Sequence, residues 1–410
     1  MSKLPKASFA VLIACTLAHF LNHVYTSLLS PFSTTIRTEL SLSLTEIGMI
    51  GSAVILAMTT THLLVGYLGD KGWRDFFIPA SVFFSSIMVI VASFASTFVF
   101  LVIAMALLGV ASSGYHPTAF PTLAQRFPKS ARAKATGTQA VGGLIGMAII
   151  PFLGVILLFI LGSWQATFIV LGILGIALFI PIYGLFRYAK SEDLKLDPKQ
   201  NQQNKDVGEE GWTLNYFLSV ILMGLRGMPF RCTAILFPLY LEDIYGFEPI
   251  WAGSLTTVLL LSGLVGEMVA APLSDKLGKR IPFLIASTGV ATPLMLMLNF
   301  SLNLGVLVVV LVVMGFFFYL GVPPNTAYIT EVSPKHSQGL AFGLIFSIGA
   351  IPGALSPIIF GYIGDLYGLP ASILYLTATL LLATIVGALL KEPKERTTQT
   401  AIVLDPVIPG

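Results

Sequence analysis

Long apolar runs recur along almost the whole of this 410-residue chain. A run of about 20 apolar residues is long enough to cross a bilayer. Such a run has to be helical, because lipid offers the backbone no hydrogen-bond partners. We therefore predict an all-α membrane protein with twelve transmembrane helices. The predicted spans are roughly residues 9–29, 47–68, 76–95, 98–123, 135–160, 164–187, 213–240, 250–272, 282–298, 302–327, 340–360 and 369–390.

Composition supports this prediction and charge placement gives the orientation. Only 10% of the residues are charged, against about 25% in soluble chains. If the N-terminus is cytoplasmic, 20 of the 23 basic residues fall in cytoplasmic segments, where Lys and Arg concentrate. We therefore expect a multi-pass protein of the plasma (inner) membrane with both termini cytoplasmic. The net charge of +3 then reflects topology, and we expect no nucleic-acid partner.

One long polar stretch separates six spans from the other six. It predicts four parts: an N-terminal six-helix bundle (1–187), a cytoplasmic linker (188–212), a C-terminal six-helix bundle (213–390) and a cytoplasmic tail (391–410). The halves repeat each other at an offset of 205–207 residues. The matched pairs include Asp70 with Asp275, Pro117 with Pro323, Gly143 with Gly349, Pro151 with Pro357 and Pro31 with Pro238. Two pseudo-symmetric bundles around a central cavity are typical of alternating-access carriers.

A charged loop motif occurs twice, once in each half. Residues 271–280 (APLSDKLGKR) fit the pattern G-x-L-x-D-[RK]-x-G-[RK]-[RK] at all but the first position. Residues 66–75 fit it more loosely, with Trp73 in place of the inner glycine and Asp75 in place of a basic residue. On these motifs the chain resembles the major facilitator superfamily, which implies its twelve-helix fold. In that family the loop locks the two halves at the cytoplasmic side. The resemblance therefore implies gating roles for Asp70, Arg74, Asp275 and Arg280.

Within that superfamily the chain is similar to fosmidomycin-resistance-type efflux carriers. The matching stretches are residues 19–22 (HFLN), 40–50 (LSLSLTEIGMI), 109–117 (GVASSGYHP) and 139–143 (QAVGG). The resemblance implies export of a small organic solute or drug. His23 stands where these carriers would have an acid, which changes any proton-handling role at that position.

Two arginines interrupt the seventh span. Arg226 lies 14 residues from both Trp212 and Tyr240, the expected ends of the span, and hence near the middle of the membrane. Arg231 lies five residues further on, with Pro229 between them. A charged residue at the membrane centre costs about 2.5–3.5 kcal/mol on insertion scales and usually serves a function. The pair suits an anionic substrate such as a carboxylate or phosphonate. Alternatively, each arginine caps carbonyls freed by a kink at Pro229 or pairs with another buried side chain.

Two histidines, His19 and His23, lie four residues apart on the first span, with Asn22 alongside. His19 matches Arg226 at the repeat offset of 207. Imidazole exchanges protons near neutral pH, so the pair predicts proton coupling; hydrogen bonding in helix packing is the alternative. The spacing also suits a metal, but two arginines oppose a cation and no carboxylate or cysteine cluster accompanies the pair. We therefore expect no metal site.

The remaining polar residues in the spans complete the expected site. Glu267 is the only acid well inside a span and is expected to take part in proton coupling or to pair with loop cations. His116 is expected near the cytoplasmic mouth, in a gating role. Besides the two arginines, the residues expected to bind substrate are Asn22, Tyr25, Tyr115 and Gln139.

These features together predict a secondary active transporter and no enzyme. The sequence contains no nucleotide-binding loop of the G-x-x-x-x-G-K-[ST] type and no convincing catalytic cluster, so we expect no cofactor. We expect a monomer in the lipid bilayer that exports a small organic, anionic solute in exchange for protons. An uptake symporter for an organic anion and, less favoured, a divalent-metal carrier are the alternatives. A receptor or a membrane enzyme that reuses the fold is disfavoured.

Overall fold

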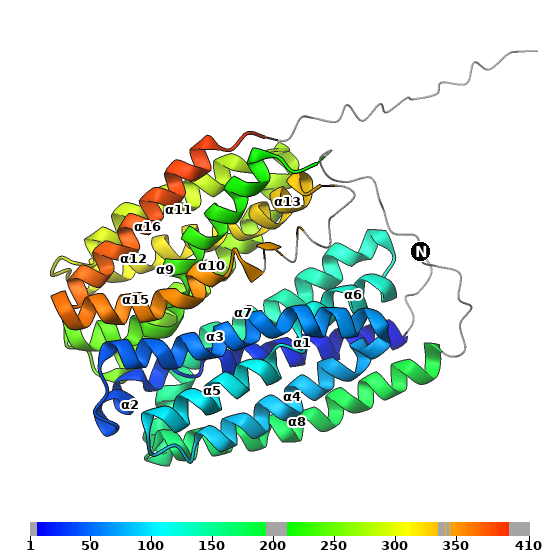
Figure 1. Ribbon diagram of the computed structural model, residues 1–410, viewed down its shortest axis with the longest axis horizontal. Helices are drawn as coiled ribbons and strands as arrows, with labels where there is room; N and C mark the ends of the chain where they lie inside the picture. The colour runs from blue at the N-terminus through cyan, green and yellow to red at the C-terminus, as the bar shows by residue number, and fades with distance from the viewer. Residues whose placement is uncertain (1–5, 194–210, 335–340, 342–343, 346, 393–410) are drawn as a thin grey trace, which may run out of the picture.

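The computed structural model describes residues 6–193, 211–334, 341, 344–345 and 347–392 (Figure 1). In the first half the helices are α1 (Lys6–Thr26), the short η1 (Ser30–Phe32) and α2 (Ser33–Glu39), α3 (Leu44–Leu68), η2 (Gly69–Trp73), α4 (Arg74–Ala92), α5 (Phe98–Ser112), α6 (His116–Arg126), α7 (Lys129–Leu161) and α8 (Trp164–Asp193). In the second half they are α9 (Leu214–Tyr245), α10 (Pro249–Leu277), α11 (Ile281–Met297), α12 (Leu304–Leu320), α13 (Val322–Val332), α15 (Ile351–Tyr367) and α16 (Leu369–Leu389).

The predicted fold class, twelve spans in two bundles, is confirmed. In the described ranges, nine helical stretches are long and apolar enough to cross a membrane. One of these, Leu44–Ala92, is 49 residues long and contains two spans, α3 and α4, joined at η2. Ile281–Met297 adds a shorter apolar helix, and the span that ends in α15 is described in part. The predicted linker and tail lie mostly outside the described residues.

The two copies of the charged loop both turn on a glycine in the left-handed region of backbone space. Gly278 ends α10 with φ 63°, and Gly72 lies inside η2 with φ 99°. Glycine has no Cβ and adopts this conformation without strain. The sequence pattern placed the inner glycine of the first copy at position 73, where Trp73 stands. The structure shows that Gly72 provides the turn one residue earlier.

Among the described residues, the main contacts between the two bundles lie toward one end of the molecule. We call the end where α8 stops at Asp193 and α9 starts at Leu214 the linker face, and the opposite end, where α2 lies, the hairpin face. In Figure 1 the bundles approach each other at the hairpin face and diverge toward the linker face. The largest contacts between the halves are those of α3 with α15 and of α7 with α10, and η1 and α2 add smaller contacts with α9.

Glycines allow the backbones of the two halves to meet directly. A Cβ on Gly48 of α3 would lie 2.1 Å from the carbonyl oxygen of Pro357 in α15. At the matched positions of the repeat, a Cβ on Gly253 of α10 would lie 2.3 Å from the carbonyl oxygen of Pro151 in α7. Small residues permit close helix approach where lipid provides no hydrophobic driving force. The repeat offset of the sequence thus reappears as a pair of equivalent contacts.

A carboxylate from one half caps a helix of the other at the hairpin face. Asp365, near the end of α15, accepts the backbone N–H groups of Leu44 and Thr45, both at 2.9 Å, at the start of α3. The Thr45 hydroxyl donates to the same side chain at 2.5 Å. Arg37 forms a second bridge between the halves by pairing with Asp243 at 2.5 Å. Burial opposes the charge on Asp365, but the Thr45 and Leu44 donors and nearby Arg37 outweigh it and lower its pKa.

We predict that Asp365→Asn loosens the closure at the hairpin face. Loss of a helix-capping carboxylate costs about 0.5–2 kcal/mol. Spin labels at Ser96 and Ser301, exposed loop positions of opposite halves, should report longer and broader distances in the variant. Because the pKa of Asp365 is depressed, the carboxylate stabilises this closure above its ordinary pKa, and the contribution is lost as pH falls through the lowered value.

Acidification should therefore loosen the wild-type closure more than that of the variant, in which only the Arg37–Asp243 bridge is left to titrate. Asp275→Asn, which removes a carboxylate that pairs within one half at the linker face, is the matched control. Unchanged hairpin-face distances in Asp365→Asn would show that the cap does not hold the two halves together.

Candidate functional site

A cavity of about 280 Å³ opens in the second half, on the side of Arg226 and Arg231. Ligand pockets usually have about 300–1,000 Å³, so the space suits a small solute. Its polar lining residues come from three helices: Arg226 and Arg231 of α9, Ser287 and Thr288 of α11, and Asn325 and Thr326 of α13. Apolar residues such as Phe230 and Phe318 complete the wall.

Arg226 faces this cavity without a carboxylate partner among the described residues. Its Nη1 donates to the carbonyl oxygen of Gly321 at 3.3 Å, and its Nη2 lies 3.5 Å from that of Phe318. Both bonds are long, and both acceptors are neutral. A Cβ on Gly321 would lie 2.5 Å from Nη2, so a larger residue here would have to displace the guanidinium. Most of the donor capacity of Arg226 therefore remains available to a ligand.

Arg231 lines the same cavity, although a spacing of five would separate the two arginines on an ideal helix. Helix α9 runs unbroken from Leu214 to Tyr245 with Pro229 inside it. The guanidinium carbon of Arg231 lies 5.8 Å from the centroid of the Phe230 ring, close enough for a cation–π contact. Within the described part of the chain it has no ion-pair partner. We call Arg226 and Arg231 the arginine pair.

Four histidine rings gather in the first half, and we call them the histidine cluster. His19 and His23 of α1 have ring centroids 4.7 Å apart. His116 of α6 lies 5.2 Å from His19 and 5.7 Å from His23. His62 of α3 lies 5.9 Å from His116. Arg231 of the other half lies within Coulombic range of His23, His62 and His116.

His19 is held in a close-fitting site. Its Nδ1 lies 2.8 Å from the backbone carbonyl oxygen of Gln139, and the Tyr115 ring stacks on it at 4.7 Å. The Tyr115 hydroxyl lies 2.6 Å from Oε1 of Gln139 and 2.8 Å from the carbonyl oxygen of Cys15. A Cβ on Gly143 would lie 2.6 Å from the imidazole. Tyr115 and Gln139, expected to bind substrate, therefore contact His19 and each other.

The repeat relates the surroundings of His19 and Arg226 as well as the residues themselves. Tyr115 stacks on His19, and the position 206 residues later is Gly321, which contacts Arg226. The first half fills this space with an aromatic ring. In the second half the Arg226 guanidinium and the Ser287 hydroxyl occupy it, and the guanidinium bonds to the Gly321 carbonyl oxygen.

Other predicted site residues lie apart from the cavity. Asn22 donates to the carbonyl oxygen of Ser112 at 2.9 Å. Tyr25 is 1% exposed and donates to the carbonyl oxygen of Leu171 at 3.0 Å, so it faces α8 within the first bundle. Glu267 of α10 is half-buried and lies within Coulombic range of Tyr319. The structure does not bring these three side chains to the arginine pair, and their roles remain predictions.

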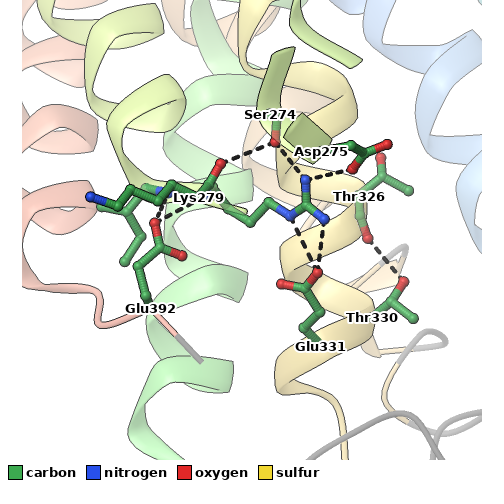
Figure 2. Close-up of polar contacts among 9 residues, drawn as sticks. Ser274, Asp275, Lys279, Thr326, Thr330, Glu331 and Glu392 are labelled. Atoms are coloured by element: carbon green, nitrogen blue, oxygen red, sulfur yellow. Dashed lines mark hydrogen bonds and ion pairs between the residues drawn. The ribbon is translucent and has the colours of Figure 1, made fainter. Parts of the chain in front are cut away.

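The predicted gating residues at the linker face pair within their own halves. Asp70 pairs with Arg74 in the first half. In the second, Arg280 lies 2.7 Å from Asp275 and 3.1 Å from Glu331, the acids drawn in Figure 2. Burial opposes the charge of Arg280, but these carboxylates outweigh it and raise its pKa. The lock between the halves that the resemblance implies is not formed among the described residues in this conformation.

Equivalent positions of the two halves carry an ion pair with exchanged charges. Arg126 lies 3.6 Å from Asp75 in the first half. The residues 205 positions later are Glu331 and Arg280, which also pair. Asp75, which departs from the loop pattern, thus belongs to a pair that the second half forms with opposite signs.

Two placements differ from the sequence analysis. His116 was expected near the mouth, yet it lies among the other histidine rings because α6 begins at this residue, well inside the bundle. His62 was not predicted as a site residue. An ionisable side chain inside an apolar span is itself a signal, and that rule applied to His62 as much as to His19.

A sequence profile of the Major Facilitator Superfamily matches residues 15–225 and again residues 216–406. The chain therefore belongs to the Major Facilitator Superfamily. The predicted resemblance is confirmed, and the protein is a membrane transporter of this superfamily. The crystal structure of a bacterial homolog to the human lysosomal transporter Spinster, inward-facing and unoccupied, has a TM-score of 0.76. It is 17% identical, covers 93% of this chain and 96% of its own, and shows the shared fold.

Relatives of similar length extend over most of this transporter. The fosmidomycin resistance protein of Escherichia coli (strain K12) is 25% identical over 88% of this chain and 87% of its own. The probable sulfoacetate transporter SauU of Cupriavidus necator is 22% identical, over 87% of each. The D-galactonate transporter of Escherichia coli O6:H1 is 24% identical over 85% of this chain and 87% of its own.

We predict that Gly143→Ala destabilises this Major Facilitator Superfamily protein through a clash with His19. Overpacking costs about 1–3 kcal/mol, so thermal unfolding in detergent should shift to lower temperature. The double variant Gly143→Ala/His19→Ala should lose less than the two single changes added together, because the clash disappears with the ring.

The matched control is Gly137→Ala on the same helix, where a Cβ meets nothing within 4 Å. It should leave the unfolding temperature unchanged or raise it slightly. Additive losses in the double variant would contradict the proposed contact between Gly143 and the imidazole.

Proposed function

We propose that this protein exports a small organic anion in exchange for protons by alternating access. The observation that carries the proposal is Arg226, a guanidinium that lines a cavity of solute size without a carboxylate partner among the described residues. A charged side chain inside a membrane span usually marks a substrate pathway. Carboxylates, sulfonates and phosphonates offer the two or three acceptor oxygens that an arginine binds with good geometry.

The names of relatives support an anion and, more weakly, export. Sulfoacetate and galactonate are organic anions, and both appear in the names of relatives that cover most of this chain. The fosmidomycin resistance protein is named for resistance to a drug, which is the outcome that export produces. These names support the substrate class and not a particular compound.

The histidine cluster supports proton coupling. Imidazole is the side chain whose unperturbed pKa allows it to gain and lose a proton between pH 5 and 8. His23, His62 and His116 lie within Coulombic range of Arg231. Protonation of the cluster and retention of an anion by the arginine pair are therefore electrostatically linked. An anion at Arg231 would favour protonated histidines, which is the coupling that the alternative, uptake by symport, requires. Exchange requires instead that the anion leaves before the protons bind.

Charge placement supports the orientation. The linker face carries most of the Lys and Arg residues and is assigned to the cytoplasm of the plasma membrane. The conformation is then inward-facing, with the hairpin face closed. In the proposed cycle residues 1–187 rock against residues 213–410, and one chain suffices because both halves belong to it.

Arg226→Ala tests the proposal in proteoliposomes that contain a pH-sensitive dye. We expect organic anions, and not cationic drugs, to move protons through the wild type. The variant should lose this response, because the guanidinium that binds the anion is absent. Arg226→Lys should recover part of it by restoring the charge without the planar fork. The direction of proton movement relative to the anion separates export by exchange from uptake by symport.

The control for a general effect of losing an arginine is Arg187→Ala. This side chain lies on α8, near Tyr183 and outside the cavity, and its loss should leave transport unchanged. Proton movement with cations only, or an undiminished response in Arg226→Ala, would return Arg226 to a structural role.

A further inference from the structure

Three imidazoles of the histidine cluster are arranged like an incomplete set of metal ligands. One ring nitrogen from each of His19, His23 and His116 lies within 4.8 Å of the other two. Nitrogens bound to zinc at 2.0–2.1 Å in tetrahedral geometry are about 3.4 Å apart. Small ring movements therefore close the set. His23 and His116 are only partly buried.

The hydrogen bonding of His19 fixes which of its nitrogens is free. The carbonyl oxygen of Gln139 can only accept a hydrogen bond, so the proton of neutral His19 belongs on Nδ1, 2.8 Å away. Nε2 then carries a lone pair, and this buried atom has no hydrogen-bond partner among the described residues. Metal-bound histidines commonly hold the other ring N–H on a carbonyl in this way, which orients the ring and raises its basicity.

The surroundings of His19 also hold the ring in place. Tyr115 stacks on one side, and Gly143 leaves no room for a Cβ. The fourth histidine, His62, lies beside His116, and its Nε2 is likewise buried without a hydrogen-bond partner in the described ranges. A buried polar atom that lacks a hydrogen-bond partner lowers the stability of the fold unless another group or ion binds it, and Nε2 of both His19 and His62 is in this position.

We propose that His19, His23 and His116 bind a divalent transition-metal ion with imidazole preference, for which Zn²⁺ is the probe. Imidazole ligands suit zinc, copper and nickel, whereas magnesium and calcium prefer oxygen. Three histidines leave a fourth position open, as in zinc sites that bind water. The metal occupies lone pairs that protons would otherwise take, so its binding competes with protonation of the cluster.

Arg231 is the main electrostatic objection to a cation here, and the sequence analysis counted it against a metal. It belongs to the other half, and its distance from the cluster depends on how the halves are packed. Its positive charge weakens metal binding without removing any ligand. Replacing it by a neutral residue should therefore strengthen the site, which a structural role for the histidines does not predict.

The test is calorimetric titration of the full chain in detergent, purified without a polyhistidine tag, with ZnCl₂ at pH 7.5. One Zn²⁺ per chain is expected, with no response to Mg²⁺. His116→Gln should weaken zinc binding by at least about tenfold. Loss of a group that only hydrogen-bonds to a ligand already costs about 10–100-fold in affinity, and loss of a ligand should cost no less. Arg231→Gln should bind zinc several-fold more tightly. His336→Gln, which removes a histidine outside the described residues and outside the proposed ligand set, should bind it unchanged.

If His116→Gln folds poorly, a second variant that replaces one metal-binding side chain by another still tests the proposal. His23→Cys replaces an imidazole by a thiolate, so it should retain zinc and gain affinity for the softer Cd²⁺. The proposal is overturned if the wild type takes up no zinc, if His336→Gln loses as much as His116→Gln, or if His23→Cys shows no gain for Cd²⁺. None of these results depends on the transported solute, so the metal site and the proposed export stand or fall separately.

Discussion

Hydrocarbon gives a polar group no water to bond to, and the structure of the spans follows from that constraint. Backbone groups are satisfied inside helices, so the fold is helical throughout its described spans. Polar side chains in the interior turn to backbone carbonyls: His19 to Gln139, Arg226 to Gly321, and Tyr25 to Leu171. Of these, Tyr25 is satisfied by good contacts within its bundle. Arg226 has only long bonds to neutral acceptors, so more of its donor capacity is available to a ligand.

The number of spans, the two bundles and the repeat could be predicted from the sequence. The lengths of the apolar runs and the spacing of glycines and prolines can be read directly from the order of the residues. It located the arginine pair through the rule that ionisable residues in spans are functional. It could not show that His116 meets His19, because the start of α6 inside the bundle is a tertiary feature. It also could not show that Tyr25 faces α8, since helical spacing gives relative faces and not the neighbour each face meets.

The two halves of the internal repeat share their backbone contacts but differ in the side chains at equivalent positions. The paired glycines and prolines at the contacts between halves are the same in kind. The ion pair at the linker face keeps its position but swaps its charges. At the centre, one half presents imidazoles and the other presents guanidinium groups. Under the proposed function, a solute between the two halves would meet proton-binding groups on one side and permanent cations on the other.

Most of α3 extends beyond its contact with α15 at Gly48. The helix continues for 20 residues beyond that glycine to Leu68, which is about 30 Å at the helical rise per residue. A rotation of 10° about this point displaces the far end by about 5 Å, which is comparable to the width of a small solute. Because Gly48 lies near one membrane face, a small change in how it packs against the Pro357 carbonyl would, in the proposed cycle, open or close a much wider gap at the other face.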